Sequence, residues 1–284
     1  MRIDRVSRQQ IYRAFQEAFS DYALDMSSLT DKRLRVRCVK NGVDWETSVG
    51  AFDGDRMVGF TLIGIDAWQG GMGAFDAATG IMPDFRGQGL ASAMFEHALP
   101  GLKDRGVETF VLEVIKDNEP AIRAYRKAGF EVSREFKCFE LQVANLRGEP
   151  AELDSIQIRS VDRQVVSSVA EYADWPPSWE NSFAAIERVQ DELIVVGAFD
   201  GESCIGTAAY TPMFNWIITI LVEPSYRRQG IGTALMRELV RSLPEEIEAV
   251  RLHNVEASDA GMVEFLYGLG FESLVDQYEM TRPV

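Results

Sequence analysis

The chain has 284 residues, of which 46% are hydrophobic and 26% charged, and a formal net charge of −15 at pH 7. This length suits two domains with a core each, and no apolar run approaches the roughly 20 residues of a membrane span. The negative charge excludes non-specific binding to nucleic acid, which needs a basic surface. Residues 1–150 carry a net charge of −2 and the remainder −13, so the acidic second half indicates a solvated surface or a cationic amine as partner.

Two features concern the cellular location. The start, Met1–Arg5, lacks the apolar segment of a signal peptide, so none is expected. Three widely spaced cysteines, Cys38, Cys138 and Cys204, are typical of reduced thiols rather than of a disulfide framework. A cytoplasmic protein is therefore expected. Its two histidines have no ligand spacing to other metal-binding residues, and no metal is expected.

The apolar periodicity of residues 1–147 predicts alternating helices and strands. In order, these are a helix capped by Ser7, a helix from about Thr30, a β-hairpin over 48–63, a strand ending at Ile81, a helix from Leu90 to about Gly101, a strand over 109–115, a helix from Asn118 to Gly129, and two closing strands within Phe130–Val143. A linker is expected at Arg147–Pro150.

One six-residue pattern occurs twice, each time after a strand and a proline and at the start of a helix. The copies are Arg86-Gly87-Gln88-Gly89-Leu90-Ala91 and Arg227-Arg228-Gln229-Gly230-Ile231-Gly232. The free N–H groups and the dipole of a helix start attract an anion, and glycine lets a phosphate approach the backbone. Each copy therefore predicts a binding loop, called a cradle below, for a cofactor that carries a diphosphate.

The pattern Arg/Gln-x-x-Gly-x-Gly/Ala between a strand and a helix resembles the acyl-CoA pyrophosphate loop of the GNAT superfamily of N-acyltransferases. The resemblance covers nearly the whole chain as two tandem copies. It implies an α/β (α+β) fold of two GNAT-like domains, each a mixed, mostly antiparallel sheet flanked by helices. It further implies acetyl-CoA as co-substrate, direct transfer of acetyl to a primary amine of a small acceptor, and cofactor contacts by the backbone at Ile81 and Val222.

A second repeat supports duplication. The segment VGAFDG at 196–201 repeats 49–54 with an offset of 147, whereas the cradles are offset by 141. The first copy therefore carries six extra residues between these points, which we place in the loop between Trp68 and Gly73. The expected domains are 1–147, with the working site, and 154–284, which is degenerate, structural or regulatory.

The resemblance also indicates residues for the chemistry. Tyr125 stands where GNAT enzymes often place a general acid, and a tyrosine with a pKa near ~10 can protonate a thiolate whose thiol has a pKa near ~8.5. Asn118 matches a residue that often contacts the cofactor. Glu113 is the first candidate for the base and Asp76 the reserve. The alternative for Tyr125 is a core aromatic side chain.

The second copy differs at these positions. The offset of 141 places Leu266 at the position of Tyr125 and Asp259 at that of Asn118, with Tyr267 one residue later. One residue turns a helical side chain by ~100°, so Tyr267 is expected to point elsewhere. The second copy thus keeps a cradle but lacks the acid.

Other interpretations are weaker or remain open. Dinucleotide and P-loop nucleotide motifs do not fit the loop and its surroundings. A non-catalytic acyl-CoA-binding sensor or scaffold is the alternative to an enzyme. The loop Trp175–Trp179 either lines an acceptor pocket or packs the domains together. Two fused copies favour a monomer that acts as an intrachain pseudo-dimer.

Overall fold

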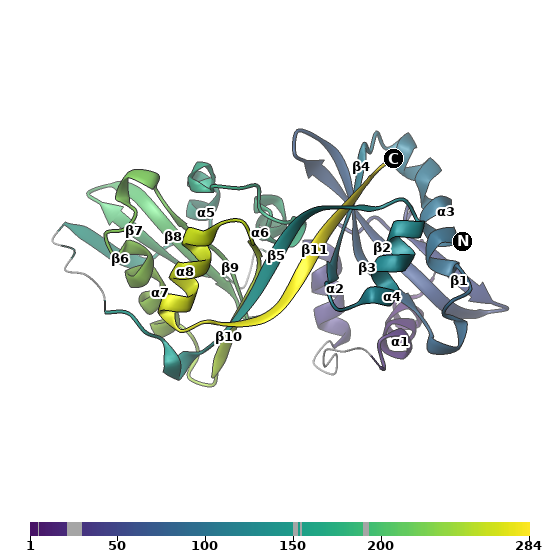
Figure 1. Ribbon diagram of the computed structural model, residues 1–284, viewed down its shortest axis with the longest axis horizontal. Coiled ribbons are helices and arrows are strands. Elements are labelled where there is room, and N and C mark those ends of the chain that lie inside the picture. The colour runs from purple at the N-terminus through teal and green to yellow at the C-terminus, as the bar shows by residue number, and fades with distance from the viewer. Residues whose placement is uncertain (5, 22–29, 150–152, 154, 190–192) are drawn as a thin grey trace. The chain divides into compact units, whose positions relative to one another are not determined.

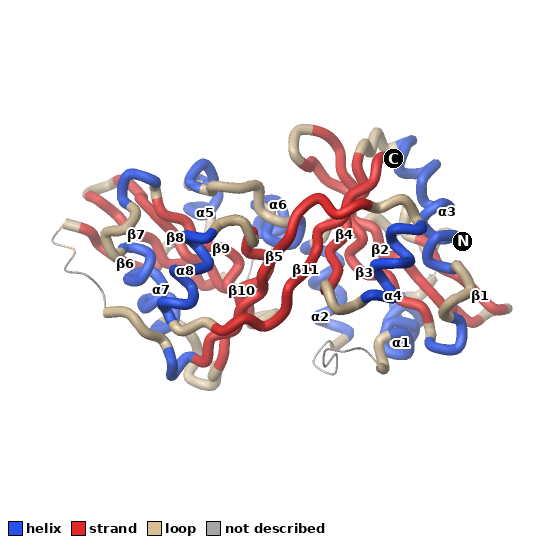
Figure 2. Tube along the Cα trace, in the orientation of Figure 1, coloured by secondary structure: helices blue, strands red, loops and turns tan. Residues whose placement is uncertain are grey.

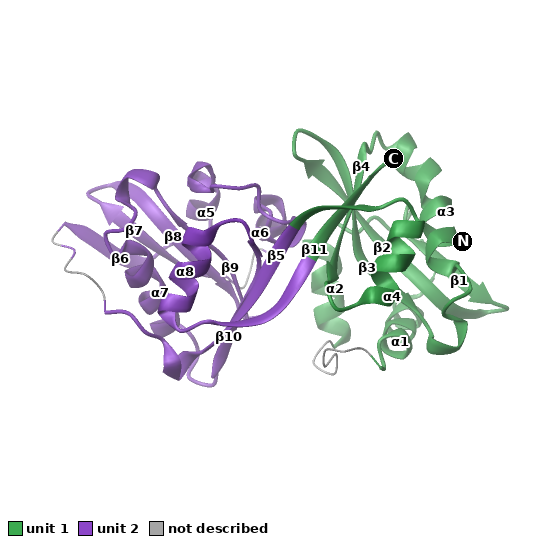
Figure 3. Cartoon of the chain, viewed as in Figure 1, with its two compact units in different colours: residues 1–134, 278–284 green, residues 135–277 purple. Residues whose placement is uncertain are grey.

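A computed structural model of the chain describes residues 1–4, 6–21, 30–149, 153, 155–189 and 193–284 (Figure 1). It divides into two compact units: unit 1 contains Met1–Arg134 and Tyr278–Val284, and unit 2 contains Glu135–Gln277 (Figure 3). Each unit is a sheet with helices packed against it, as the red strands and blue helices of Figure 2 show. Within the described residues, every helix is too short or too polar to cross a membrane.

Unit 1 has a mixed sheet in the order β1-β2-β3-β4, followed by parts of β11 and β5. Pairing is antiparallel from β1 to β3 and parallel between β3 and β4. Its elements are α1 (Arg8–Ala18), α2 (Asp31–Lys40), β1 (Val49–Asp53), β2 (Arg56–Trp68), β3 (Gly71–Ile81), the 3-10 turn η1 (Pro83–Phe85), α3 (Leu90–Asp104), β4 (Thr109–Ile115), α4 (Glu119–Lys127) and the first residues of β5 (Glu131–Gln142).

Unit 2 repeats this order as β6-β7-β8-β9-β10, followed by the remaining parts of β5 and β11. Pairing is antiparallel from β6 to β9 and parallel between β9 and β10. Its elements are η2 (Val143–Asn145), β6 (Ile156–Ser160), α5 (Gln164–Ser168), η3 (Ala170–Tyr172), η4 (Trp179–Asn181), α6 (Phe183–Arg188), β7 (Ile194–Asp200), β8 (Ser203–Thr211), β9 (Trp216–Val222), η5 (Pro224–Tyr226), α7 (Ile231–Arg241), β10 (Ala249–Glu256), α8 (Ala260–Leu269) and β11 (Glu272–Pro283).

The helix starts follow from their capping residues. Ser7 accepts a hydrogen bond from the Gln10 backbone while the Gln10 side chain accepts from the Ser7 N–H, a capping box that fixes the start of α1. Asn118 caps α4 in the same unit, with Pro120 in the first turn where its missing N–H costs nothing. These predicted starts are confirmed.

The two closing strands expected within Phe130–Val143 are wrong, because this segment is one strand, β5. Its twelve residues contain no Gly, Pro, Asn or Asp, and Ser133 is the one residue that favours a turn, so the signal for a break is weak. Phe136–Gln142 pair with β10 in unit 2. Unit 1 instead takes the end of β11, whose Met280 is fully buried in its core. The compact units thus exchange strands, and the linear boundary between residues 147 and 154 stays a prediction.

The six extra residues of the first copy lie in the hairpin between β2 and β3. Ile63 pairs with Asp76 beside a bulge in unit 1, and Tyr210 pairs with Ile217 beside the matching bulge in unit 2. Twelve residues, 64–75, separate the first pair and six, 211–216, the second. The longer hairpin therefore accounts for the difference in offset.

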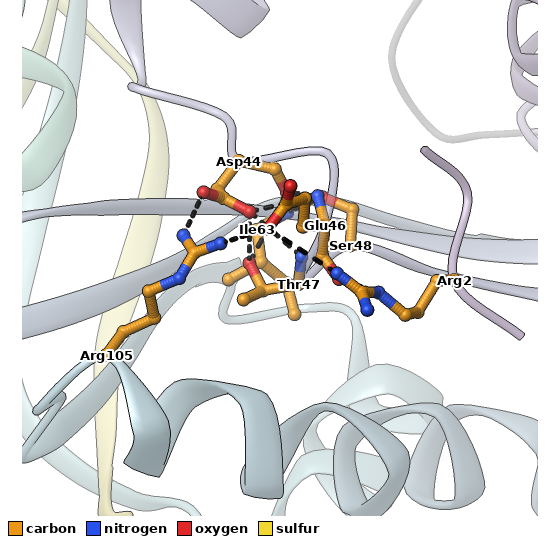
Figure 4. Close-up of polar contacts among 7 residues, drawn as sticks. All are labelled: Arg2, Asp44, Glu46, Thr47, Ser48, Ile63 and Arg105. Carbon is orange, nitrogen blue, oxygen red and sulfur yellow. Dashed lines mark hydrogen bonds and ion pairs between the residues drawn. The ribbon is translucent and has the colours of Figure 1, made fainter. Parts of the chain in front are cut away.

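A polar cluster fixes the strand opposite Asp76 (Figure 4). The Ser48 hydroxyl accepts from the Ile63 N–H at 2.9 Å, and the Ile63 carbonyl accepts from the Asp44 N–H at 2.8 Å. Arg105, at the end of α3, bonds Asp44 and, at 2.6 Å, Glu46. Burial raises the pKa of Asp44, but the hydrogen bonds from Arg105 and the neighbouring backbone outweigh it and lower the pKa.

Candidate functional site

In unit 1 the sheet opens where β3 and β4 stop pairing. The parallel register runs from Gly73 opposite Thr109 to Phe75 opposite Val111 and ends there, although β3 continues to Ile81. Beyond this point β3 keeps β2 as its partner on one side. The edge that faces β4 is left for another hydrogen-bonding group.

The first cradle joins β3 to α3. Gly87 and Gly89 have φ values of 74° and 79°, which favour glycine, and a Cβ built on either meets no atom within 4 Å. Gly89 caps α3 without any side-chain hydrogen bond to the first turn. The first turn of α3 thus has no side-chain cap, the space beside both glycines is open, and the helix dipole makes this position favourable for an anion.

The Arg86 guanidinium serves the protein rather than the open space. Its Nε donates to the Ile81 carbonyl at 3.1 Å, and one terminal nitrogen donates to the Ala18 carbonyl at 2.8 Å. Both terminal nitrogens bond Asp21 at 2.7 Å, and this bond lowers the pKa of Asp21 and raises that of Arg86. Arg86 therefore ties the end of α1 to the last residue of β3.

Arg227 makes the same contacts in unit 2. Its Nε donates to the Val222 carbonyl at 2.9 Å, and its terminal nitrogens bond the Tyr172 carbonyl at 2.8 Å and Asp174 at 2.7 Å. The first arginine of each cradle is thus a positioning residue. The sequence signal for this role is that it is the one charged residue the two copies share within the pattern.

The second cradle keeps one glycine of the pair. Gly230 caps α7 with a φ of 87°, matching Gly89, but Arg228 replaces Gly87 and has a φ of 62°. A non-glycine residue in this region carries strain of about 1–2 kcal/mol. The shared backbone path shows that the loop requires this conformation in both units.

Unit 2 contains a cavity of about 400 Å³ beside this cradle. It lies where β9 and β10 separate, after the register of Trp216 with Arg251 and Ile217 with Leu252. Its mostly apolar lining includes Trp175, Pro177, Phe183, Ile218, Ile220, Val222, Arg228, Gly230, Gly232, Leu252, His253, Val255, Asp259, Met262 and Phe265. The loop at Trp175 thus lines a pocket, one of the two interpretations of this segment.

A loop of unit 2 is fastened to the rim of this cavity by β10. Asn254 has a φ of 59° at a bulge of the strand and donates to the Ser178 hydroxyl at 3.0 Å. Asn181 donates to the His253 carbonyl at 2.8 Å. His253 itself packs on Trp216, with ring centroids 4.6 Å apart. These contacts hold the cavity wall in one conformation.

Unit 1 brings Tyr125 and Asp76 together. The Tyr125 ring packs against Phe95 and Phe130 at 5.9 and 6.1 Å, while its hydroxyl hydrogen-bonds Asp76. Thr79 donates to the same carboxyl at 2.8 Å and Thr61 at 3.3 Å. Burial raises the pKa of Asp76 to about 7, although these hydrogen bonds oppose the shift. Tyr125 is therefore both a core aromatic residue and a hydroxyl held by a buried acid.

Sequence reasoning missed the two threonines. Asp76 and Thr79 are three apart, a spacing that places strand residues on opposite faces. The bulge at Ala77 adds one residue, so Ile63 opposite Asp76 and Thr61 opposite Thr79 share a face. The sequence did contain a signal for them: when the two copies are aligned, Asp76, Thr79 and Thr61 of the first copy stand opposite apolar residues of the second.

In unit 2 the corresponding positions are apolar. Ile217 and Ile220 replace Asp76 and Thr79, Ala208 replaces Thr61, and Leu266 replaces Tyr125. All four are buried in the core of unit 2. The exposed Tyr267 contacts Phe139 edge to face at 5.5 Å. Unit 2 thus lacks the polar network of unit 1 at every one of these positions.

The remaining predicted residues occupy separate places. The Asn118 side chain accepts from the Ala121 N–H at 3.2 Å, and Asp259 caps α8 through Met262 in the same way. Glu113 is half-buried on β4, on the strand face opposite Leu112 and Val114, whereas the Tyr125 ring packs with those two in the core. The sheet thus separates Glu113 from the Asp76–Tyr125 pair.

Comparisons with known proteins agree with this geometry. A family model described as "Acetyltransferase (GNAT) family" matches residues 8–130 and 163–271. N-alpha-acetyltransferase 30 of Schizosaccharomyces pombe is 35% identical over 86 residues, which cover 30% of this chain and 57% of that protein. Streptothricin acetyltransferase of Streptomyces lavendulae is 37% identical over 83 residues, covering 29% and 42%. The matched part is thus about half of these relatives.

A solved tandem GNAT protein from the clavulanic acid biosynthesis pathway has the same fold over nearly the full length. The TM-score is 0.73 at 16% identity, and the match covers 99% of this chain and 95% of that one.

Proposed function

The chain belongs to the acetyltransferase (GNAT) family, and from this premise we propose that it transfers an acetyl group from acetyl-CoA directly to a primary amine of a small acceptor. The observation that carries the proposal is the first cradle, which has open space beside its two glycines and follows a strand whose pairing with β4 ends at Phe75. Streptothricin acetyltransferase, by its name, acts on a small molecule, which favours an acceptor of that kind.

The residues around the first cradle fit coenzyme A. The backbone from Gly87 to Ala91 would hold the diphosphate, because uncapped N–H groups and the dipole of α3 favour a doubly charged group. The free edge of β3 up to Ile81 would take the amide groups of the pantetheine arm. Bound acetyl-CoA supplies the activated thioester. The chain contributes position, oxyanion-stabilising N–H groups and proton transfer.

Tyr125 is the proposed general acid. The amine nitrogen bonds to the acetyl carbon, the carbon–sulfur bond breaks, and the sulfur takes the Tyr125 hydroxyl proton. Glu113 is the proposed acceptor, directly or through water, of the proton that the amine loses. Because Glu113 and Tyr125 lie on opposite faces of the sheet, one can serve the incoming amine while the other serves the leaving sulfur.

Unit 1 is the proposed catalytic unit and unit 2 a unit that binds acyl-CoA without turnover. Support comes from two replacements in unit 2: Leu266 stands at the position of Tyr125, and Ile217 at the position of Asp76. Unit 2 nevertheless keeps a cradle and has a cavity beside it. The sensor function, the alternative for the chain as a whole, is therefore proposed for unit 2 alone. A small cationic amine as partner, a cytoplasmic location and a monomeric state stay predictions.

The test is Tyr125→Phe with Tyr267→Phe as matched control. Turnover of acetyl-CoA is measured with a panel of amines covering amino acids, polyamines, aminoglycosides and peptide N-termini, and acetyl-CoA affinity by calorimetry. We expect Tyr125→Phe to lower kcat about 100-fold with unchanged affinity, and Tyr267→Phe to leave both unchanged. Unaltered turnover in Tyr125→Phe would remove Tyr125 from the mechanism. Tight binding without turnover on any amine would favour the sensor for both units.

A further inference from the structure

Asp76 is a buried carboxyl directly behind the hydroxyl of Tyr125. The residue is 7% exposed, receives hydrogen bonds from the Thr61 and Thr79 hydroxyls, and lies within hydrogen-bonding reach of the Tyr125 hydroxyl. The hydroxyl oxygens of Thr79 and Thr61 lie 2.8 Å apart, so the two threonines and the carboxyl form one closed polar cluster. The transfer step described above uses the tyrosine but gives this carboxyl no task.

The fold does not need the network. Unit 2 builds the same bulge between β8 and β9 and fills the corresponding positions with Ile217, Ile220 and Leu266, all buried. Burying an ionisable group costs free energy, whereas apolar side chains at the same places add to the core. The same chain thus shows that an apolar solution exists, and the polar one in unit 1 calls for a functional reason.

The relative acidities supply that reason. Burial is the largest influence on Asp76 and raises its pKa to about 7; the charge of Arg37 from α2 and the hydrogen bonds from Tyr125 of α4, Thr61 of β2 and Thr79 oppose it. Proton transfer from a tyrosine with a pKa of ~10 to a thiolate, whose thiol has a pKa of ~8.5, is unfavourable because the donor is the weaker acid. Proton transfer from a carboxylic acid with a pKa of about 7 to the same thiolate is favourable because the donor is the stronger acid.

We propose that Asp76 is a positioning residue that acts through Tyr125: it orients the hydroxyl and replaces the proton that the hydroxyl gives to the leaving sulfur. As the carbon–sulfur bond breaks, the sulfur takes the Tyr125 proton and the phenol oxygen takes the Asp76 proton. The carboxylate left on Asp76 regains a proton from water after product leaves. The amine's own proton goes to the separate base, so each proton has one donor and one acceptor. This inference rests on the function proposed above.

The test compares pH profiles of kcat at saturating acetyl-CoA and amine for wild type, Asp76→Asn and Thr79→Val. Dividing wild-type kcat by variant kcat at each pH cancels the ionisation of the amine. For Asp76→Asn we expect a ratio of roughly 10 below pH 7 that falls towards one as the pH rises through about 7. Thr79→Val removes a donor that favours the ionised form, so the alkaline fall in its kcat moves to higher pH.

A ratio that stays constant with pH would overturn the proposal, because a purely structural role lowers kcat equally at all pH values. A ratio that grows with pH would overturn it in favour of Asp76 as the base that takes the amine proton. A second readout needs no turnover: the infrared difference spectrum of wild type minus Asp76→Asn should contain a protonated carboxyl band that titrates near pH 7. With that band present and every amine inactive, the proposed function fails while the protonation of Asp76 stands; without the band, the relay fails.

Discussion

Gly89→Ala tests the first cradle most directly. Gly89 has a φ of 79° and open space around its missing Cβ, so an alanine meets no atom of the protein but adopts an unfavourable backbone conformation. The methyl group would instead stand in the space where a phosphate approaches the amides. Gly54→Ala is the matched control, because Gly54 has a φ of 57°, also has open space, and lies in the turn between β1 and β2.

The magnitudes follow from these surroundings. Each alanine should destabilise the protein by about 1–2 kcal/mol through its left-handed backbone. In the cradle the added methyl should also displace one charge-assisted hydrogen bond between an amide and the diphosphate, worth about 1.5–3 kcal/mol. The Kd for acetyl-CoA at this site should therefore rise roughly 10- to 150-fold for Gly89→Ala and stay unchanged for Gly54→Ala.

The assay combines calorimetry with acetyl-CoA, steady-state kinetics and urea unfolding, and includes Gly230→Ala in the second cradle. We expect Gly89→Ala to lower kcat/KM for acetyl-CoA and Gly230→Ala to weaken a second binding event without lowering turnover. If Gly89→Ala and Gly54→Ala had the same affinity, the first cradle would not hold the cofactor. A loss of turnover in Gly230→Ala alone would transfer catalysis to unit 2.

Two further predictions concern stability. The Glu279 side chain is 2% exposed and forms an ion pair with Arg134 at 2.8 Å, so Arg134→Met should lower the free energy of unfolding in urea by about 3–5 kcal/mol. Arg56→Met, which breaks the exposed pair with Glu17, should cost at most about 1 kcal/mol. Equal costs for the two variants would contradict the assignment of Arg134–Glu279 as a buried pair. The lowered pKa of Asp44 means that its ionised form stabilises the folded state at pH values above its unfolded pKa and that this stability disappears as the pH falls through the folded pKa. Replacing Arg105 with Leu should flatten that acid dependence, and an unchanged slope between about pH 5 and pH 2 would refute it.

The sequence predicted the local features well, for physical reasons. Ser7 and Asn118 announce helix starts because their side chains satisfy the free N–H groups of a first turn. The glycines of the cradles announce a backbone conformation that other residues avoid, and Gly89 and Gly230 both adopt it. Spacing also placed the six extra residues in one hairpin, because a shared offset fails only where residues have been added.

The exchange of strands was missed because the pattern of Glu131–Gln142 predicts a strand but does not indicate which strand it pairs with. The pairing of its halves depends on β10 and on the end of β11, more than a hundred residues away. The partner of Arg86 was missed for a related reason. A guanidinium at a phosphate loop reads as a phosphate ligand, and only the folded chain brings Asp21 and the Ala18 carbonyl to it.

The sequence by itself determined the duplication, the two cradles and the loss of Tyr125's counterpart, because each is written in neighbouring residues or in a constant offset. The tertiary structure decided which groups meet. A bulge of one residue turns Thr79 to the side of Asp76, and the packing of α4 carries the Tyr125 hydroxyl to the same carboxyl. Such contacts join residues far apart in the chain, and burial, which follows only from folding, raises the pKa of Asp76 to about 7.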